Sequence, residues 1–351
     1  MKSCHGYGGE YASGVSDLTR SPWLRAALLI GAVGLAVYGL VSQWAQVQAA
    51  LGKLDGWDVA GAAVCAIAGL GCMMLAWRAL LADLGSPLPL PAAIRVMFVG
   101  QLGKYVPGAV WAVAGQVELA RDYAVPRRRS ATASLVAMAV TLVVGLVAAG
   151  VTLPLVSGHA VRQYWWVLAV TPLAAACLYP PVIKFGLDRV LRVLRRAPLE
   201  GSVGRGGMAR ALGWTTIGWL CYGAHAWFLI SVFAVKGGGE VGGGGSYALS
   251  LGAYALAWAV GFLIIFFPGG IGPREVALIA VLAPVMPSGS ALVVALASRV
   301  VMTVGDLAWA GAGLAIGRAS RPAGPGDTQP SPDPDPPLVS RPGGGGLPRD
   351  R

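Results

Sequence analysis

The sequence predicts an all-α fold: a polytopic integral membrane helical bundle of seven to nine membrane segments, two of them re-entrant or half-helix segments broken by Pro and Gly. Hydrophobic residues make up 56% of the 351 residues and charged residues only 12%, and the mean hydropathy is +0.64. A soluble domain of this length would need a more polar surface. Seven apolar runs are long enough to cross about 30 Å of hydrocarbon. Two further apolar segments contain charges and Pro-Gly pairs, which membrane depth tolerates only where the backbone is buried in protein or lines a polar cavity.

The predicted crossings follow directly from the apolar runs. They cover residues 24 to 41, 59 to 82, 131 to 154, 164 to 183, 212 to 234, 246 to 267 and 290 to 317. The first run also fits a cleaved signal peptide, but it is longer than the apolar core of such peptides, so we favour a retained anchor helix. Residues 92 to 118 and 274 to 287 are interrupted or short, which favours half-helices; if they cross, the count rises to eight or nine.

Lys and Arg residues in the short loops predict the orientation in the cell membrane. The loop at 121 to 129 carries four of them and the stretch at 184 to 210 carries seven, so both are expected in the cytoplasm. The N-terminus is then cytoplasmic if the segment 92 to 118 returns to the side from which it enters. The C-terminus lies outside if 274 to 287 re-enters and inside if it crosses, and basic residues after the final run favour the inside.

The chain divides into three regions. Residues 1 to 22 form a predicted cytoplasmic N-terminal segment, and residues 23 to 318 form the membrane domain. Residues 319 to 351 are so rich in Pro, Gly and Asp that they cannot bury a core, and we predict a disordered tail. Each Pro-Gly break follows two predicted crossings, one pair in each half of the chain, which is consistent with an internal duplication.

Composition and motif content argue against several functions. The net charge of +11 comes from short clusters beside apolar runs, so it indicates topology and no nucleic-acid partner. The five cysteines form no C-x-x-C pair and the histidines are isolated, so neither a metal nor another cofactor is expected. Without a P-loop, G-x-S-x-G or H-E-x-x-H motif, we expect no catalytic residue and no enzyme activity. His225 is interpreted as a hydrogen-bonded core histidine.

Ionisable residues in or beside the apolar segments mark the candidate site, because an unpaired charge in hydrocarbon is costly and such residues face the protein interior or a wet cavity. They are Lys104, Glu118, Arg274, Glu275, Arg299 and Asp306. Arg299 and Asp306 lie seven residues apart, hence on one face of the last run but about 10.5 Å apart along the helix axis. This separation is too large for an ion pair, so each of the two needs a partner on another segment.

Two of these cations lie at the Pro-Gly breaks. Lys104 precedes the first break, and Arg274 follows the glycines of the second. Free backbone amides and the positive end of a half-helix attract an anion at such a break, so we expect these two cations to bind a phosphate. In the alternative, both cations extend to lipid headgroups at the cytoplasmic surface, and Glu118 and Glu275 only neutralise them.

The sequence around the breaks resembles a known family. The blocks GKYVPGAVW at 103 to 111 and FFPGGIGPRE at 266 to 275 are similar to two motif blocks of the lysylphosphatidylglycerol synthase transmembrane family. The resemblance spans about residues 24 to 318. The matching positions are Gly103, Lys104, Tyr105, Pro107, Gly108, Trp111, Pro268, Gly269, Gly270, Gly272, Arg274 and Glu275.

This resemblance implies a function in lipid translocation. In bacterial multiple peptide resistance factors, the region that this chain resembles is flippase-like and moves an aminoacylated phospholipid between leaflets. The expected substrate here is a phospholipid or a polyprenyl-phosphate-linked lipid. None of the 351 residues resembles the soluble aminoacyl-transferase domain of those factors, which implies a stand-alone membrane module.

The resemblance and the charge pattern together suggest roles for the candidate residues. Contact with a lipid headgroup or phosphate is expected of Lys104, Tyr105, Trp111 and Arg274. Charge balance or contact with a cationic group is expected of Glu118, Glu275, Arg299 and Asp306. The expected partners are membrane lipids and, in the alternative reading, a separate lipid-modifying or glycosyl-transferring enzyme for which this protein is a scaffold. A third option is a membrane-embedded transferase that uses Glu118 or Glu275 as a base.

Overall fold

The computed structural model describes residues 52, 54–105, 110–156, 203–233, 243–264, 270 and 272–319, together with the five positions 181, 182, 185, 189 and 192. The predicted crossing at 24 to 41, most of that at 164 to 183, the N-terminal segment and nearly all of the tail lie outside the described residues. The same holds for four of the predicted break residues, Pro107, Gly108, Pro268 and Gly269.

Helices account for all regular structure in the described residues, so the predicted all-α fold class is confirmed. The helices are α4 (Gly56–Asp83), α5 (Leu90–Ile94), α6 (Val110–Arg121), α7 (Arg127–Val156), α11 (Arg205–Ile230), α12 (Gly243–Leu263), α13 (Pro273–Leu282) and α14 (Ser288–Ala319), with a π-helical turn η1 (Arg95–Val99) and a 3-10 turn η2 (Leu102–Tyr105). Within the described part, α4, α7 and α14 are long and apolar enough to cross a membrane.

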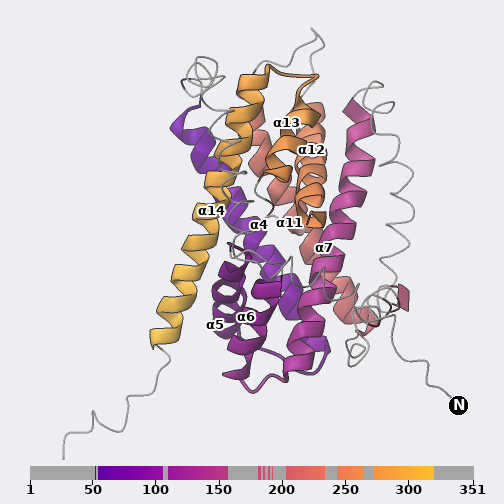
Figure 1. Cartoon of the computed structure of the whole chain (residues 1–351), viewed down its shortest axis with the longest axis vertical. Helices are drawn as coiled ribbons and strands as arrows, with labels where there is room; N and C mark the ends of the chain where they lie inside the picture. Colours follow the sequence, from indigo (N-terminus) through magenta and orange to yellow (C-terminus); the bar gives the residue numbers. More distant parts are fainter. Residues whose placement is uncertain are drawn as a thin grey trace, which may run out of the picture.

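The segment predicted at 92 to 118 is a re-entrant hairpin. Its first arm, α5 with η1 and η2, rises from the lower end of the bundle in Figure 1, and its second arm, α6, returns there. The arms touch backbone to backbone: a Cβ atom on Gly103 would lie 2.6 Å from the carbonyl carbon of Trp111, and one on Gly100 would lie 2.7 Å from the Gln116 nitrogen. Only glycine permits this approach. Both ends of the segment therefore lie on one side of the bundle.

A second hairpin enters from the opposite end. Helix α12 descends from the upper end of the bundle to its middle, and α13 returns upward beside it (Figure 1). The turn depends on Gly270 and Gly272, whose φ angles of 69° and 95° lie in the left-handed region that favours glycine. Gly270 also packs against the backbone of Gly261, where a Cβ would lie 3.0 Å from the carbonyl oxygen.

This geometry corrects the interpretation of residues 246 to 267. Their length and apolarity predicted a full crossing, but α12 is the first arm of a hairpin, because α13 packs back along it. The predicted half-helix at 274 to 287 is its second arm. The chain then crosses once more through α14, so the end of α14 lies at the same end of the bundle as the basic loop 121 to 129 (Figure 1).

The two halves form an inverted repeat. In each half a long helix precedes the hairpin and another follows it: α4 and α7 in the first half, α11 and α14 in the second (Figure 1). Helices α4 and α11 cross at Gly69 and Gly218, where a Cβ on either residue would lie 3.2 or 3.3 Å from the carbonyl oxygen of the other. Gly145 of α7 packs against α11, and Gly305 of α14 packs against α4 in the matching position. Hairpins entering from opposite sides are the arrangement of inverted-repeat transporters, and this arrangement supports the predicted duplication.

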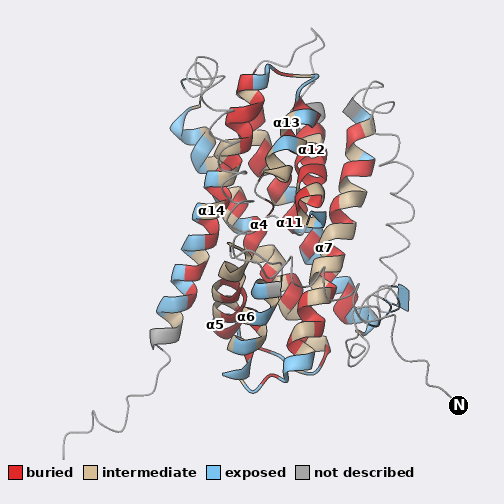
Figure 2. Cartoon of the chain, viewed as in Figure 1, coloured by how far each residue is buried: buried red, intermediate tan, exposed pale blue. Residues whose placement is uncertain are grey.

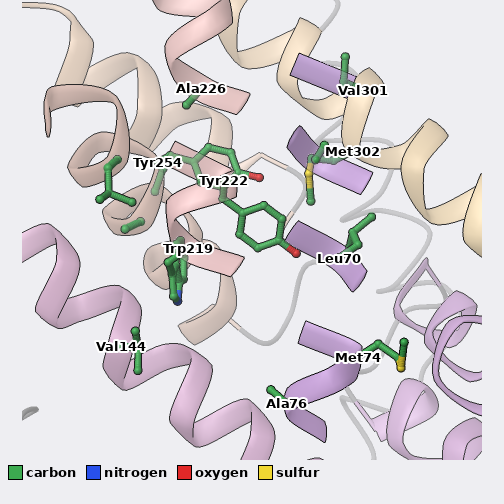
Figure 3. Close-up of a cluster of buried hydrophobic side chains, with 14 of the residues drawn as sticks. Leu70, Met74, Ala76, Val144, Trp219, Tyr222, Ala226, Tyr254, Val301 and Met302 are labelled. Atoms are coloured by element: carbon green, nitrogen blue, oxygen red, sulfur yellow. The ribbon is translucent and has the colours of Figure 1, made fainter. Parts of the chain in front are cut away.

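The core lies between the two halves. Buried faces of the helices point into the bundle and exposed faces point outward (Figure 2). The close-up in Figure 3 shows Tyr222 pointing toward Leu70 of α4 and Met302 of α14, whereas Trp219 lies on the side of α7, to which its indole N–H donates a hydrogen bond at Thr141. His225 is fully buried, and its ring nitrogens lie 3.0 Å from the Ala62 carbonyl oxygen and 2.9 Å from Ser298 Oγ. This arrangement is the satisfied core histidine expected from the sequence.

Asp83 joins the ends of α4 and α11, and its loss should destabilise the protein. The N-cap residue of α11, Gly204, has no side chain to cap the helix, and its backbone N–H donates to Asp83 Oδ2 at 2.5 Å. We expect Asp83→Ala to lower the free energy of unfolding by about 1 kcal/mol, the usual effect of losing an N-cap acceptor. Thermal unfolding in detergent measures this change. Asp83→Asn keeps an acceptor and should lose less; equal losses would contradict the capping role.

Candidate functional site

The first hairpin ends at a buried carboxylate on α14. Lys104 Nζ lies 2.6 Å from Asp306 Oδ2, and the Tyr105 hydroxyl donates to the same oxygen at 2.7 Å. The Asp306 side chain is only 6% exposed, whereas that of Lys104 is 30% exposed. The partner that Asp306 was predicted to need is therefore the tip of the hairpin. The cation remains accessible while its counter-ion is enclosed.

The second hairpin contacts the same helix about two turns away. Glu275 Oε1 lies 3.5 Å from a terminal nitrogen of Arg299, and both side chains are largely buried, at 15% and 18% exposure. The other oxygen, Glu275 Oε2, accepts a hydrogen bond from the Gly272 N–H at 2.7 Å. Glu275 thus occupies a backbone donor at the start of α13, where the sequence predicted an external anion. The prediction that Arg299 pairs with another segment is confirmed.

Arg274 is held by an aromatic residue. Its guanidinium carbon lies 4.6 Å from the centre of the Tyr254 ring, and it donates a hydrogen bond to the Tyr254 hydroxyl. Tyr254 is fully buried in α12, so the ring fixes the position of the cation without neutralising it. Sequence reasoning missed Tyr254, because a tyrosine within an apolar run has the same pattern as any core aromatic residue.

The other predicted residues lie apart from this cluster. Glu118 is 61% exposed and pairs with Arg121 at 2.5 Å and Arg127 at 3.2 Å, and not with Lys104 or Arg274, the two cations that the alternative assigned to it. The hydrogen bond from Arg121 holds the pKa of the Glu118 carboxyl below its ordinary value. Trp111, at the start of α6, is half exposed and packs its backbone against Gly103.

A buried chain of hydrogen bonds fixes the first hairpin in place. Trp77 Nε1 of α4 donates to Ser134 Oγ of α7 at 3.1 Å, and Ser134 Oγ donates to Gln116 Oε1 of α6 at 2.6 Å. Gln116 Nε2 in turn contacts the Met97 sulfur at 3.2 Å. The chain joins both hairpin arms to the two helices that flank them. A glutamine between apolar residues was a usable signal for such a position, but its partners were not predictable.

The central cluster carries a surplus of positive charge. Its cations are Lys104, Arg274 and Arg299 and its carboxylates are Glu275 and Asp306, so three positive and two negative charges leave one net positive charge. The cluster lies where the two hairpins meet α14. Such an arrangement suits an anionic group on a lipid. In the described part of the chain, no three His, Cys, Asp or Glu residues gather to hold a metal ion.

Comparison with protein families assigns the chain. Residues 23–310 match the lysylphosphatidylglycerol synthase TM region. The chain belongs to this family. The match includes both re-entrant hairpins and the part of α14 that carries Arg299 and Asp306. No curated protein matches the chain. Membership in the lysylphosphatidylglycerol synthase TM region family and the apolar helices together identify a membrane-embedded helical protein.

Proposed function

We propose that this protein is a non-enzymatic lipid translocase that moves a phosphate-bearing headgroup between leaflets while the acyl chains stay in the bilayer. One observation carries the proposal: two hairpins enter from opposite ends and bring charged tips to the same helix in the middle of the bundle. A charged site where broken helices meet near the middle of the bundle is the arrangement of many alternating-access transporters. Family membership supports a role in lipid handling.

The proposed roles follow from accessibility and charge. Lys104 is the most exposed charge at the first tip and would bind a phosphate oxygen of the headgroup. Arg274, which rests on the Tyr254 ring, would bind a second oxygen from the other hairpin, and planar guanidinium groups suit such bidentate contacts. Tyr105 and Trp111 would border the headgroup path. Phospholipids and polyprenyl-phosphate-linked lipids both supply the required phosphate.

A leaflet-exchange assay tests this function. Purified protein in liposomes should exchange fluorescent phosphate-bearing lipids, and Lys104→Ala or Arg274→Ala should reduce the rate by about tenfold or more, because a charge-assisted hydrogen bond contributes roughly 1.5–3 kcal/mol. Arg210→Ala is the matched control, since Arg210 lies at the start of α11 and bonds to the Gly206 carbonyl oxygen. Mass spectrometry of the lipid should show no chemical change.

The other outcomes separate the alternatives. Exchange at the wild-type rate in both Ala variants would refute the phosphate-binding role. A chemically altered lipid would indicate a transferase. No exchange of anionic, cationic or polyprenyl-phosphate lipid by folded protein would favour a scaffold, for which substitutions in the basic stretch 184 to 210 should disrupt the recruited activity.

A further inference from the structure

Asp306 combines burial, an ion pair and an unsatisfied oxygen. Its Oδ2 receives both Lys104 and the Tyr105 hydroxyl. Its Oδ1 is buried and has no hydrogen-bond partner among the described residues. Among the described residues, the hydrogen-bond donors to this carboxylate therefore both come from the tip of the first hairpin. A buried carboxylate that loses its counter-ion is strongly destabilised.

The proposed function requires the hairpin tip to bind something else. If the phosphate of a lipid takes the place of the Asp306 carboxylate at Lys104, the carboxylate is left enclosed without a neighbouring cation. Two outcomes avoid this cost: the carboxylate gains another positive partner, or it takes up a proton. The side chains around Asp306 decide between them.

The cations on neighbouring elements are already engaged. On α14 itself, Arg299 lies about 10.5 Å away along the axis and pairs with Glu275. Arg274 of α13 is held on the Tyr254 ring, and in the proposed function its charge is used by the lipid phosphate itself. From the first hairpin, Arg95 pairs with Asp122 near the lower end of α14.

The remaining neighbours bring no charge. Tyr222 of α11 and Tyr254 of α12 lie within electrostatic range of Asp306 and are neutral in their ordinary state. Helix α4 presents Ile67 and Leu70 to the adjacent Gly305. No neighbouring side chain therefore supplies a second cation to Asp306, and a proton is the remaining source of positive charge. The unsatisfied Oδ1 atom is an available acceptor for that proton.

We propose that Asp306 takes up one proton whenever the phosphate of a lipid headgroup replaces its carboxylate at Lys104, so that the site binds an anion and a proton together. This proposal rests on the proposed function. The proton bonds to a carboxylate oxygen of Asp306 and leaves when Lys104 returns. Affinity for the anion then rises as the pH falls, and a proton gradient across the membrane biases the distribution of anionic lipid between leaflets.

Binding measured against pH tests the coupling. With the full chain in nanodiscs, affinity for a fluorescent phosphatidylglycerol should increase by up to about tenfold per unit decrease in pH, the limit for one coupled proton. Asp306→Asn imitates the protonated carboxyl and should bind the lipid tightly at every pH. Asp122→Asn is the matched control, because Asp122 is 55% exposed and pairs with Arg95 outside the site; it should keep the pH dependence of the wild type.

Three results would overturn the coupling. The first is an unchanged pH dependence in Asp306→Asn. The second is weaker binding in this variant at every pH, which would indicate that Asp306 contacts a cationic group of the lipid. The third uses only the wild-type protein and so does not depend on the folding of a variant: addition of phosphatidylglycerol in weak buffer should remove about one proton from solution per lipid bound, and no uptake contradicts the proposal.

The proposal and the proposed function can fail separately. Lipid exchange that requires Lys104 but does not respond to pH or to an imposed proton gradient would refute the coupling and leave the translocase intact. Proton-linked binding without any exchange would refute the translocase and leave a proton-linked anion site.

Discussion

Replacing Gly103 by Ala is expected to reduce the proposed lipid exchange by at least about tenfold, because the two arms of the first hairpin touch at this residue. The added Cβ would lie 2.6 Å from both the carbonyl carbon and the carbonyl oxygen of Trp111. These are backbone atoms, so no rotamer change relieves the clash and the arms must separate. Overpacking of this kind costs about 1–3 kcal/mol. Separation of the arms also moves Lys104 and Tyr105 away from Asp306.

The same substitution at Gly213 provides the control. Gly213 lies within α11, and a Cβ there meets no atom within 4 Å. Gly213→Ala should leave exchange unchanged and slightly raise thermal stability, since alanine is the better helix former. Wild-type exchange in Gly103→Ala would show that close contact between the arms is not required. Equal loss in both variants would point to a general effect of substitution.

Removing the carboxylate of Glu275 is expected to destabilise the protein by about 3–5 kcal/mol, the usual cost of breaking a buried ion pair from one side. In Glu275→Gln, Arg299 loses its carboxylate partner, and the Gly272 N–H keeps only an amide oxygen as acceptor. Both side chains of the pair are less than one-fifth exposed, so water compensates little. Chemical or thermal unfolding in detergent measures the effect.

Two further variants separate the ion pair from other effects. Glu118→Gln removes an exposed carboxylate that also pairs with arginines and should change stability little, because surface pairs are solvent-screened. Arg299→Gln combined with Glu275→Gln should recover part of the loss, since neither charge is then left behind. A loss in Glu275→Gln no larger than in Glu118→Gln would refute a stabilising role for the buried pair.

The sequence predicted where the site lies better than it predicted which of its residues pair with one another. The Pro-Gly breaks and the charges around them identified Lys104, Arg274, Glu275 and Asp306, all of which the structure brings to the centre of the bundle. Charge inside an apolar segment is a local property, so it is visible in the chain. The pairing of Lys104 with Asp306 joins residues more than two hundred positions apart and has no local signal.

Some local patterns were ambiguous until the packing was known. Glu118 and Glu275 both follow a cation and a glycine-rich break in the sequence, yet Glu118 is exposed at the bundle end, whereas Glu275 of α13 is largely buried against Arg299 of α14. The difference depends on how far along its hairpin arm each residue lies. In the sequence, Tyr254 likewise has the same pattern as other aromatic residues within apolar runs. Only the structure shows that Arg274 lies over its ring.

By itself, the sequence determined the membrane environment, the helical class, the two breaks and the family, because hydrophobicity, helix-breaking residues and short motifs act over a few turns of chain. Tertiary structure alone decided that α12 turns back instead of crossing, that the hairpins enter from opposite ends, and that α14 joins both tips through Asp306 and Arg299. A helix arm of the same length and apolarity can cross or return. Only the packing of the next segment selects between the two; here Gly270 of the turn and Arg274 of α13 pack against Gly261 of α12.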